Sequence, residues 1–214
     1  MTVILAEHKI SYIPVPKVAC TSLKTMFFEV ENGFHFKNFR TSGRPWHVHF
    51  FYRSIPFADQ DLSRMAGHRV MAVVRDPVKR VLSCYSNRVL HHKDLSEKRA
   101  GAQLLAADLP CDPDLSTFIA RLPEYCGAVE SIWHHAMPMV DYLGRDPQFY
   151  THLYPIERTG DMQAEVARLT GVSAELKQLQ TKGPKIDPSV LNAAERAVIH
   201  EFYAEDYAFY GTCW

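Results

Sequence analysis

The stretch "IPVPKVACTSLKTMFFEV", residues 13–30, joins a short apolar run to a helical pattern through a polar turn. Residues 9–15 are typical of a buried strand. From Ser22 onward, apolar residues occupy the i, i+3, i+4 and i+7 positions of one helical face. These positions are Leu23, Met26, Phe27 and Val30. The stretch therefore predicts a strand, a turn and a helix in succession.

The turn carries a lysine and two hydroxyl residues, Lys17, Thr21 and Ser22, in place of the glycines of a nucleotide-triphosphate loop. Thr21 or Ser22 is the expected N-cap of the helix. A helix N-terminus offers unpaired N–H groups and about half a positive charge, which favours a bound phosphate-like group. The turn therefore predicts an anion site. The alternative is a capped helix with a surface lysine.

A second strand–turn–helix unit begins in "HRVMAVVRDP". Residues 70–74 form a continuous apolar run, which is typical of a strand covered on both faces. Asp76 is the expected N-cap, and Pro77 is the expected first residue of the helix. Arg75 stands where the strand ends, and a guanidinium group suits bidentate contact with phosphate. The alternative is an ion pair between Arg75 and a carboxylate.

The second helix carries Ser83, eight positions after Arg75. Ser83 is a further candidate for anion contact, or else an ordinary residue of a helix surface. Parallel strands place ligands at their carboxyl ends. Two such turns therefore predict a doubly wound α/β protein in which two anion sites face one crevice.

The remaining segments are expected to complete this fold. Residues 32–56, rich in Gly, Pro and aromatic residues, are predicted as mostly loop, with a short strand at 46–52. Residues 94–143 are predicted as several broken helices, and residues 148–158 contain a further short strand.

Two more helices are expected near the C-terminus. One ends at Gly171, and a long one begins at Asp187 and Pro188. The residues expected on the buried side of the long helix are Leu191, Val198, Phe202 and Tyr203.

Composition limits the classes of protein that need consideration. A chain of 214 residues with zero formal net charge suits a single domain and has no overall attraction for nucleic acid. The N-terminus lacks the pattern of a signal peptide, and no window reaches the roughly 18 apolar residues of a membrane span. Five scattered cysteines without a Cys-x-x-Cys pair predict a reduced, cytoplasmic setting and no structural zinc site.

The two turns resemble a known family. "PKVACTSLK" is similar to the 5′-phosphosulfate-binding loop of sulfotransferases that use 3′-phosphoadenosine 5′-phosphosulfate (PAPS), and "VVRDPVKRVLSCY" is similar to their 3′-phosphate-binding strand and helix. The closest likeness is to the carbohydrate sulfotransferases of the chondroitin, dermatan, heparan 2-O and HNK-1 type and their bacterial relatives. "WHHAMPMVDYLG", "YPIERTGDM" and "FYAEDYAFYG" resemble later segments of that family. "LQTKGPK" occupies the place of its cofactor-covering loop, near Gln180–Lys182.

The resemblance implies a fold, a reaction and a set of residues. The fold is a P-loop-like, three-layer α/β domain over residues 1–214, with a central, mostly parallel sheet flanked by helices. The reaction is in-line transfer of a sulfuryl group from PAPS, without a metal, to a hydroxyl of a carbohydrate or similar small acceptor. Lys17 would stabilise the leaving bisphosphate. The residues implied in cofactor binding are Lys17, Val18, Ala19, Cys20, Thr21, Ser22, Arg75 and Ser83.

Transfer to a hydroxyl needs a general base, and histidine suits that role near neutral pH. His47 and His49 in "WHVHF" are the candidates, and His47 matches the base of the heparan 2-O type best. On a strand the two side chains would share a face, so either could serve. A metal site at this pair lacks a third ligand at a recognisable spacing.

Two other classes of function remain as alternatives. The first is a P-loop-like nucleotide kinase, although the chain lacks the G-x-x-x-x-G-K-[ST] pattern and an evident acidic strand end for Mg²⁺. The second is a non-catalytic nucleotide-binding domain that keeps the fold.

Overall fold

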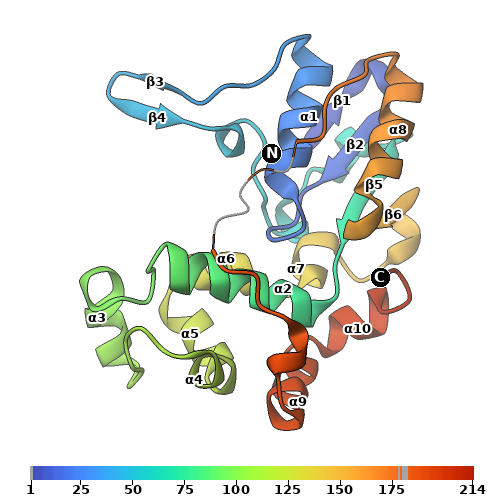
Figure 1. The fold of residues 1–214 in the computed structure, drawn as a ribbon. Coiled ribbons are helices and arrows are strands. Elements are labelled where there is room, and N and C mark those ends of the chain that lie inside the picture. The colour runs from blue at the N-terminus through green and yellow to red at the C-terminus, as the bar shows by residue number, and fades with distance from the viewer. Residues whose placement is uncertain (1, 178, 180–182) are drawn as a thin grey trace. The chain divides into compact units, whose positions relative to one another are not determined.

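The computed structural model describes residues 2–177, 179 and 183–214 (Figure 1). The chain divides into two compact units. The first unit consists of Met1–Val74, Met139–Gln180 and Thr212–Trp214, and the second of Arg75–Pro138 and Thr181–Gly211. The sequence predicts a single domain over residues 1–214, and this division into compact units does not test that prediction.

The first unit is built on a four-stranded sheet in the order β1-β2-β5-β6. β1 is antiparallel to β2, whereas β2, β5 and β6 are parallel to one another. The strands are β1 (Val3–Leu5), β2 (Ile10–Ile13), β5 (Arg69–Val74) and β6 (His152–Pro155). Every residue of β2, and every residue of β5 after Arg69, is buried, so both faces of the centre of the sheet are covered. A mostly parallel sheet flanked by helices confirms the predicted α/β class.

Helices α1 (Cys20–Asn32) and α8 (Thr159–Thr170) lie beside this sheet (Figure 1). The predicted apolar stripe of α1 is buried, and the ring of Phe27 stacks on Tyr12 of β2 with 5.1 Å between centroids. Gly171 ends α8 in the left-handed conformation, as predicted. The unit also contains α7 (Met139–Leu143).

The N-cap of α1 is Ala19, so the prediction of Thr21 or Ser22 at that position was wrong. Ala19 adopts a left-handed conformation, and no side chain caps this end of the helix. Thr21 and Ser22 lie within the first turn instead. Their hydroxyls are engaged by segments distant in the sequence, which local capping preferences do not anticipate.

The segment after α1 differs from the predicted loop. It contains a hairpin of β3 (Phe39–Thr41) and β4 (Arg44–Trp46). The predicted strand over 46–52 does not form, because His47 leads into a 3-10 helix, Val48–Phe50. Phe51 and Tyr52 beyond it both pack on the ring of Phe28 of α1, which alternating strand side chains could not do.

The second unit is helical in the part of the chain that the structure describes. Asp76 caps α2 by accepting from the Lys79 N–H at 2.9 Å, and Pro77 is the first helical residue, so both predictions are confirmed. The predicted broken helices over 94–143 are also confirmed. The helices of this unit are α2 (Pro77–Cys84), a π-helix (Tyr85–His91), α3 (Glu97–Ala106), α4 (Leu115–Ala120), α5 (Leu122–Ala128), α6 (Glu130–Ala136), α9 (Ala193–Phe202) and α10 (Ala204–Tyr210).

The predicted long C-terminal helix is interrupted twice. Asp187 caps only a 3-10 turn, Pro188–Val190, and α9 begins after Asn192, which forms a capping box with Glu195. The second interruption is at Tyr203, whose hydroxyl donates to the Ala136 carbonyl at 2.5 Å. The predicted buried side is correct, because Leu191, Val198, Phe202 and Tyr203 all lie in or against the core of this unit.

Short 3-10 helices connect the other elements: Ala6–His8, Phe57–Asp59, Leu62–Met65, Pro147–Phe149 and Ile156–Arg158. Within the described residues, no helix combines the length and the apolar character needed to cross a bilayer.

Candidate functional site

The turn before α1 forms without glycine because two ordinary residues take the left-handed conformation. Lys17 has a φ of 67° and Ala19 a φ of 59°. Successive backbone N–H groups in left-handed turns can form an anion-binding concavity, and this turn directly precedes the N-terminus of α1. The side chain of Val18 between them is fully buried and anchors the turn to the core. Left-handed non-glycine residues are costly, and such strain is concentrated at functional sites.

The charge of this turn suits an anion. Residues 13–28 contain Lys17 and Lys24 but no aspartate or glutamate. This stretch therefore contains no carboxylate that could repel a phosphate or sulfate group, and none that could hold Mg²⁺ as in a kinase. The backbone conformation and the charge together fit the phosphosulfate end of a PAPS molecule.

Two hydroxyls of the first turn of α1 connect this helix to distant segments. The Thr21 Oγ1 lies 2.9 Å from the Nε2 of His49. The Ser22 Oγ accepts from the backbone N–H of Leu179 at 3.0 Å. Because Ser22 acts as an acceptor there, its own O–H is left to donate to another group.

Lys24 is a functional candidate that the sequence analysis missed. Its side chain is fully buried, and its Nζ contacts the Nδ1 of His49 at 3.1 Å and donates to the Ser54 Oγ at 3.0 Å. Burial lowers the pKa of Lys24 from its ordinary value, because desolvation penalises the charged form. The sequence could have indicated Lys24 as a site residue, because it follows Thr21 by three positions and shares its side of the helix.

These contacts define the proton positions on His49. An ammonium group only donates, so the Nδ1 of His49 accepts from Lys24. The Nε2 then carries the proton and donates to the Thr21 hydroxyl. Both ring nitrogens are thus engaged, and His49 links α1 to the histidine segment.

His47 has a different environment. Its side chain is exposed, and its ring makes no hydrogen bond to another residue in the described part of the chain. The centroids of the His47 and His49 rings are 5.5 Å apart, although neither residue lies on a strand. Partial burial, and then the charge of Lys24, lower the pKa of His47 from its ordinary value of 6.5. The neutral, proton-accepting form is therefore favoured near neutral pH.

Arg75 and Ser83 belong to the second unit. Arg75 directly follows β5 and is half-buried, and Ser83 is half-buried on α2. The first unit therefore brings together the residues of the first turn and both histidines, namely Lys17, Val18, Ala19, Cys20, Thr21, Ser22, His47 and His49. The second unit contains Arg75 of the second turn and Ser83 of α2.

The predicted cofactor-covering loop near Gln180–Lys182 lies outside the described residues. The described residues on either side of this loop make hydrogen bonds to other segments. Leu179 bonds to Ser22, as noted above, and the Pro184 carbonyl accepts from the Ser86 hydroxyl at 2.6 Å.

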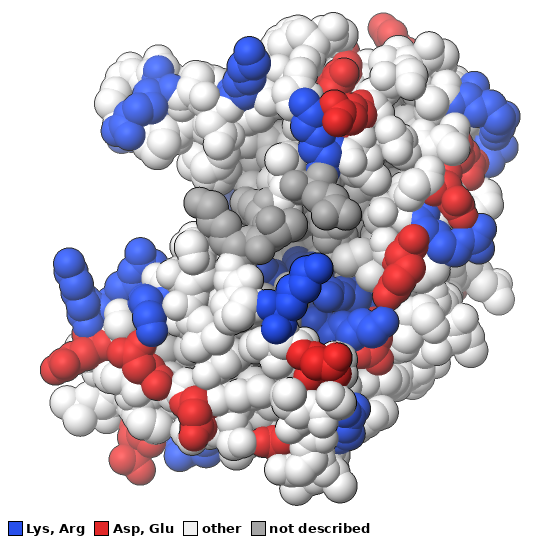
Figure 2. Space-filling model, viewed as in Figure 1, with Lys and Arg blue, Asp and Glu red and all other residues white. Residues whose placement is uncertain are grey.

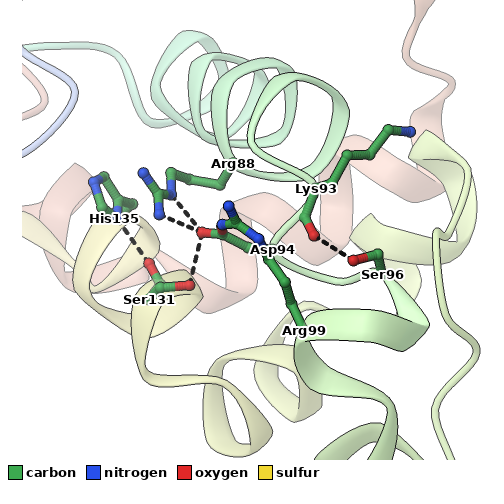
Figure 3. A network of polar contacts seen from close by, with 7 residues as sticks. All are labelled: Arg88, Lys93, Asp94, Ser96, Arg99, Ser131 and His135. Atoms are coloured by element: carbon green, nitrogen blue, oxygen red, sulfur yellow. Dashed lines mark hydrogen bonds and ion pairs between the residues drawn. The ribbon is translucent and has the colours of Figure 1, made fainter.

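A network of charged and polar residues around the buried carboxylate of Asp94 organises the second unit (Figure 3). Asp94, whose side chain is 5% exposed, pairs with both Arg88 and Arg99. It also accepts from the Ser131 hydroxyl at 2.8 Å, and the Ser131 carbonyl contacts the Nδ1 of His135 at 2.7 Å. One carboxylate thus ties the end of the π-helix to α3 and α6.

Comparison with known proteins identifies the class. A sequence model described as the sulfotransferase family matches residues 1–211. Because the match covers nearly the whole chain, the chain belongs to the sulfotransferase family. No curated protein and no solved structure matches it. The family assignment agrees with the mostly parallel sheet and makes the protein a sulfotransferase enzyme.

Proposed function

We propose that this sulfotransferase transfers a sulfuryl group from PAPS to a hydroxyl of a carbohydrate or similar small acceptor, with His47 as the general base. The observation that carries the proposal is the contact between Thr21 and His49, which joins the histidine segment to the first turn of α1 within one unit. The family generally uses PAPS, which supports the choice of donor.

When bound, PAPS supplies a sulfuryl group whose S–O bond to the 5′-phosphate breaks as a bond to the acceptor oxygen forms. The ammonium of Lys17 and the N–H groups of the first turn of α1 would stabilise the negative charge that develops on the 5′-phosphate. Arg75 and Ser83 of the second unit would bind the 3′-phosphate, as the resemblance implies.

His47 would accept the proton of the acceptor hydroxyl. Its lowered pKa keeps the ring neutral, and its exposed position leaves it open to an acceptor. His49 would hold this segment against α1, because both of its ring nitrogens are already engaged. We further propose that the enzyme acts in the cytoplasm, in keeping with its five free cysteines.

Ligand binding distinguishes this proposal from a kinase. We expect 3′,5′-adenosine bisphosphate without metal to raise the melting temperature, and ATP with Mg²⁺ to raise it much less. Equal stabilisation by ATP with Mg²⁺ would favour a nucleotide kinase.

Turnover tests the assigned roles. With radiolabelled PAPS and a panel of glycans and simple alcohols, we expect Lys17→Ala to lower kcat by about 10²–10³-fold. His47→Ala is expected to lower it by about 10²–10⁴-fold. Lys98→Ala, which removes an exposed lysine on α3, is the matched control and should keep the parent rate. A parent-like rate in Lys17→Ala would refute its role.

A further inference from the structure

The loop and hairpin after α1 expose an unusual number of aromatic rings. Four phenylalanines between residues 34 and 51 are exposed by 37% to 62% of their surface. They are Phe34, Phe39, Phe50 and Phe51. Contiguous exposed aromatic surface marks an interaction site, whereas single exposed apolar residues do not. We call this set the aromatic hairpin surface.

These rings are held in place by other aromatic residues. Phe39 stacks on Trp46 with 6.0 Å between centroids and an angle of 3°, and Phe50 lies 5.4 Å from the same indole. Phe34 packs edge-on against Phe28 of α1 at 5.5 Å. The hairpin turn is closed by a hydrogen bond of 3.0 Å from Arg40 to the Gly43 carbonyl. The surface is therefore a fixed structural feature, and its exposure is not a consequence of loose packing.

The same segment carries positive charge and no negative charge. Residues 32–58 include four cations and no aspartate or glutamate, although the chain as a whole is neutral. All four cations are exposed: Lys37, Arg40, Arg44 and Arg53. Figure 2 shows blue side chains and no red ones over the hairpin. The complementary partner is therefore anionic.

The form of the hairpin indicates the kind of anionic partner. β3 and β4 form a separate two-stranded ribbon that projects from the first unit (Figure 1), and it is exposed along almost its whole length. A projecting, exposed ribbon with apolar rings and flanking cations suits insertion into a lipid interface, where rings enter the acyl boundary and cations contact anionic headgroups. We propose that the aromatic hairpin surface docks on an anionic lipid bilayer.

The position of the surface extends this inference to the acceptor. The ring of Phe50 lies 4.3 Å from the ring of His47, so the docking surface is continuous with the proposed base. The acceptor hydroxyl is then one that a membrane-borne molecule, such as a lipid-linked sugar, presents at the bilayer surface. The identity of the acceptor rests on the proposed function, whereas the binding to lipid does not.

Sedimentation of the full-length protein with vesicles tests the proposal. We expect binding to vesicles of equal parts phosphatidylglycerol and phosphatidylcholine, and much weaker binding to phosphatidylcholine alone. Each cation near an anionic surface changes partitioning by about fivefold, so Lys37→Ser with Arg44→Ser, which keep the Arg40 bond to Gly43, should weaken binding about 30-fold. The control with equal charge change is Lys98→Ser with Arg158→Ser, both exposed outside the hairpin.

A second pair of variants, each of which replaces an apolar side chain with serine, tests the aromatic rings separately from the cations. Phe34→Ser should weaken vesicle binding severalfold, whereas Leu105→Ser, at an 83% exposed leucine of α3, should not. Circular dichroism of each variant verifies that the fold is retained.

Two outcomes would overturn the proposal. One is the absence of binding to anionic vesicles by the parent protein. The other is an equal loss of binding in the hairpin variants and their controls. If the parent protein does not bind vesicles and the hairpin variants lose turnover on a water-soluble glycan, the surface binds a saccharide chain instead of a bilayer. Vesicle binding needs neither donor nor acceptor, so its failure is distinguishable from a failure of sulfuryl transfer.

Discussion

Replacing Lys24 with methionine should weaken the link between α1 and the histidine segment and lower the stability of the protein. Methionine has nearly the length of lysine, so the change mainly removes the charge and its hydrogen bonds. The partners left behind are the Nδ1 of His49 at 3.1 Å and the Oγ of Ser54 at 3.0 Å. The substitution therefore tests the buried contact that we consider to hold His49 in place.

The magnitude follows from these two bonds and from burial. Hydrogen bonds to charged groups contribute about 1.5–3 kcal/mol each. Relief of the buried charge, whose desolvation lowers the pKa of Lys24, offsets much of that loss. We expect Lys24→Met to lower the free energy of unfolding by about 1–3 kcal/mol. Each kcal/mol corresponds to a fall in Tm of about 2–4 °C for a chain of this size.

A double-mutant cycle measures the contact itself. Lys24→Met, His49→Gln and the double variant are unfolded in guanidinium chloride and followed by circular dichroism and tryptophan fluorescence. Residues in direct contact show coupling energies of about 0.5–3 kcal/mol. The control cycle pairs His49→Gln with Lys98→Met, which removes an exposed lysine of the second unit. Additivity within about 0.3 kcal/mol in the Lys24 cycle would refute the reasoning.

Three further predictions address other parts of the molecule. Asp94→Ala should lower the free energy of unfolding by about 3–5 kcal/mol in denaturant titrations, because it leaves the largely buried Arg88 without its carboxylate; a loss below 1 kcal/mol would contradict this. Since the pKa of His47 is lowered from 6.5, the acid limb of kcat/KM should be centred below pH 6.5; an acid limb centred above pH 7 would exclude His47. Gly183→Ala should lower Tm measurably, because its φ is +102° and a Cβ would lie 2.5 Å from the Ser86 Oγ; an unchanged Tm would show that this packing does not matter.

Local patterns in the sequence predicted the regular elements well. The apolar spacing after Ser22 identified the buried stripe of α1, and the run at residues 70–74 identified the central strand β5. Asp76, Pro77 and Gly171 marked helix ends correctly. These predictions depend on interactions within about one helical turn, so the sequence alone contains the necessary information.

Contacts between distant segments explain the errors. The predicted C-terminal helix breaks at Tyr203, whose hydroxyl bonds to Ala136, 67 positions earlier. The predicted strand over residues 46–52 is a 3-10 turn instead, because its aromatic side chains pack on α1. A periodicity argument considers neighbours along the chain and not these partners.

The chemical character of the candidate site was determined by the sequence. Lys17 and the hydroxyls that follow it were recognisable from residue type and spacing, and the resemblance to the family indicated His47 and His49. The resemblance favoured His47, but only the tertiary structure supplies a physical difference between the two histidines, because the buried Lys24 contacts His49 across 25 positions of the chain. Residue types are encoded locally, whereas the proton positions and the exposure of a side chain depend on which distant groups folding brings into contact with it.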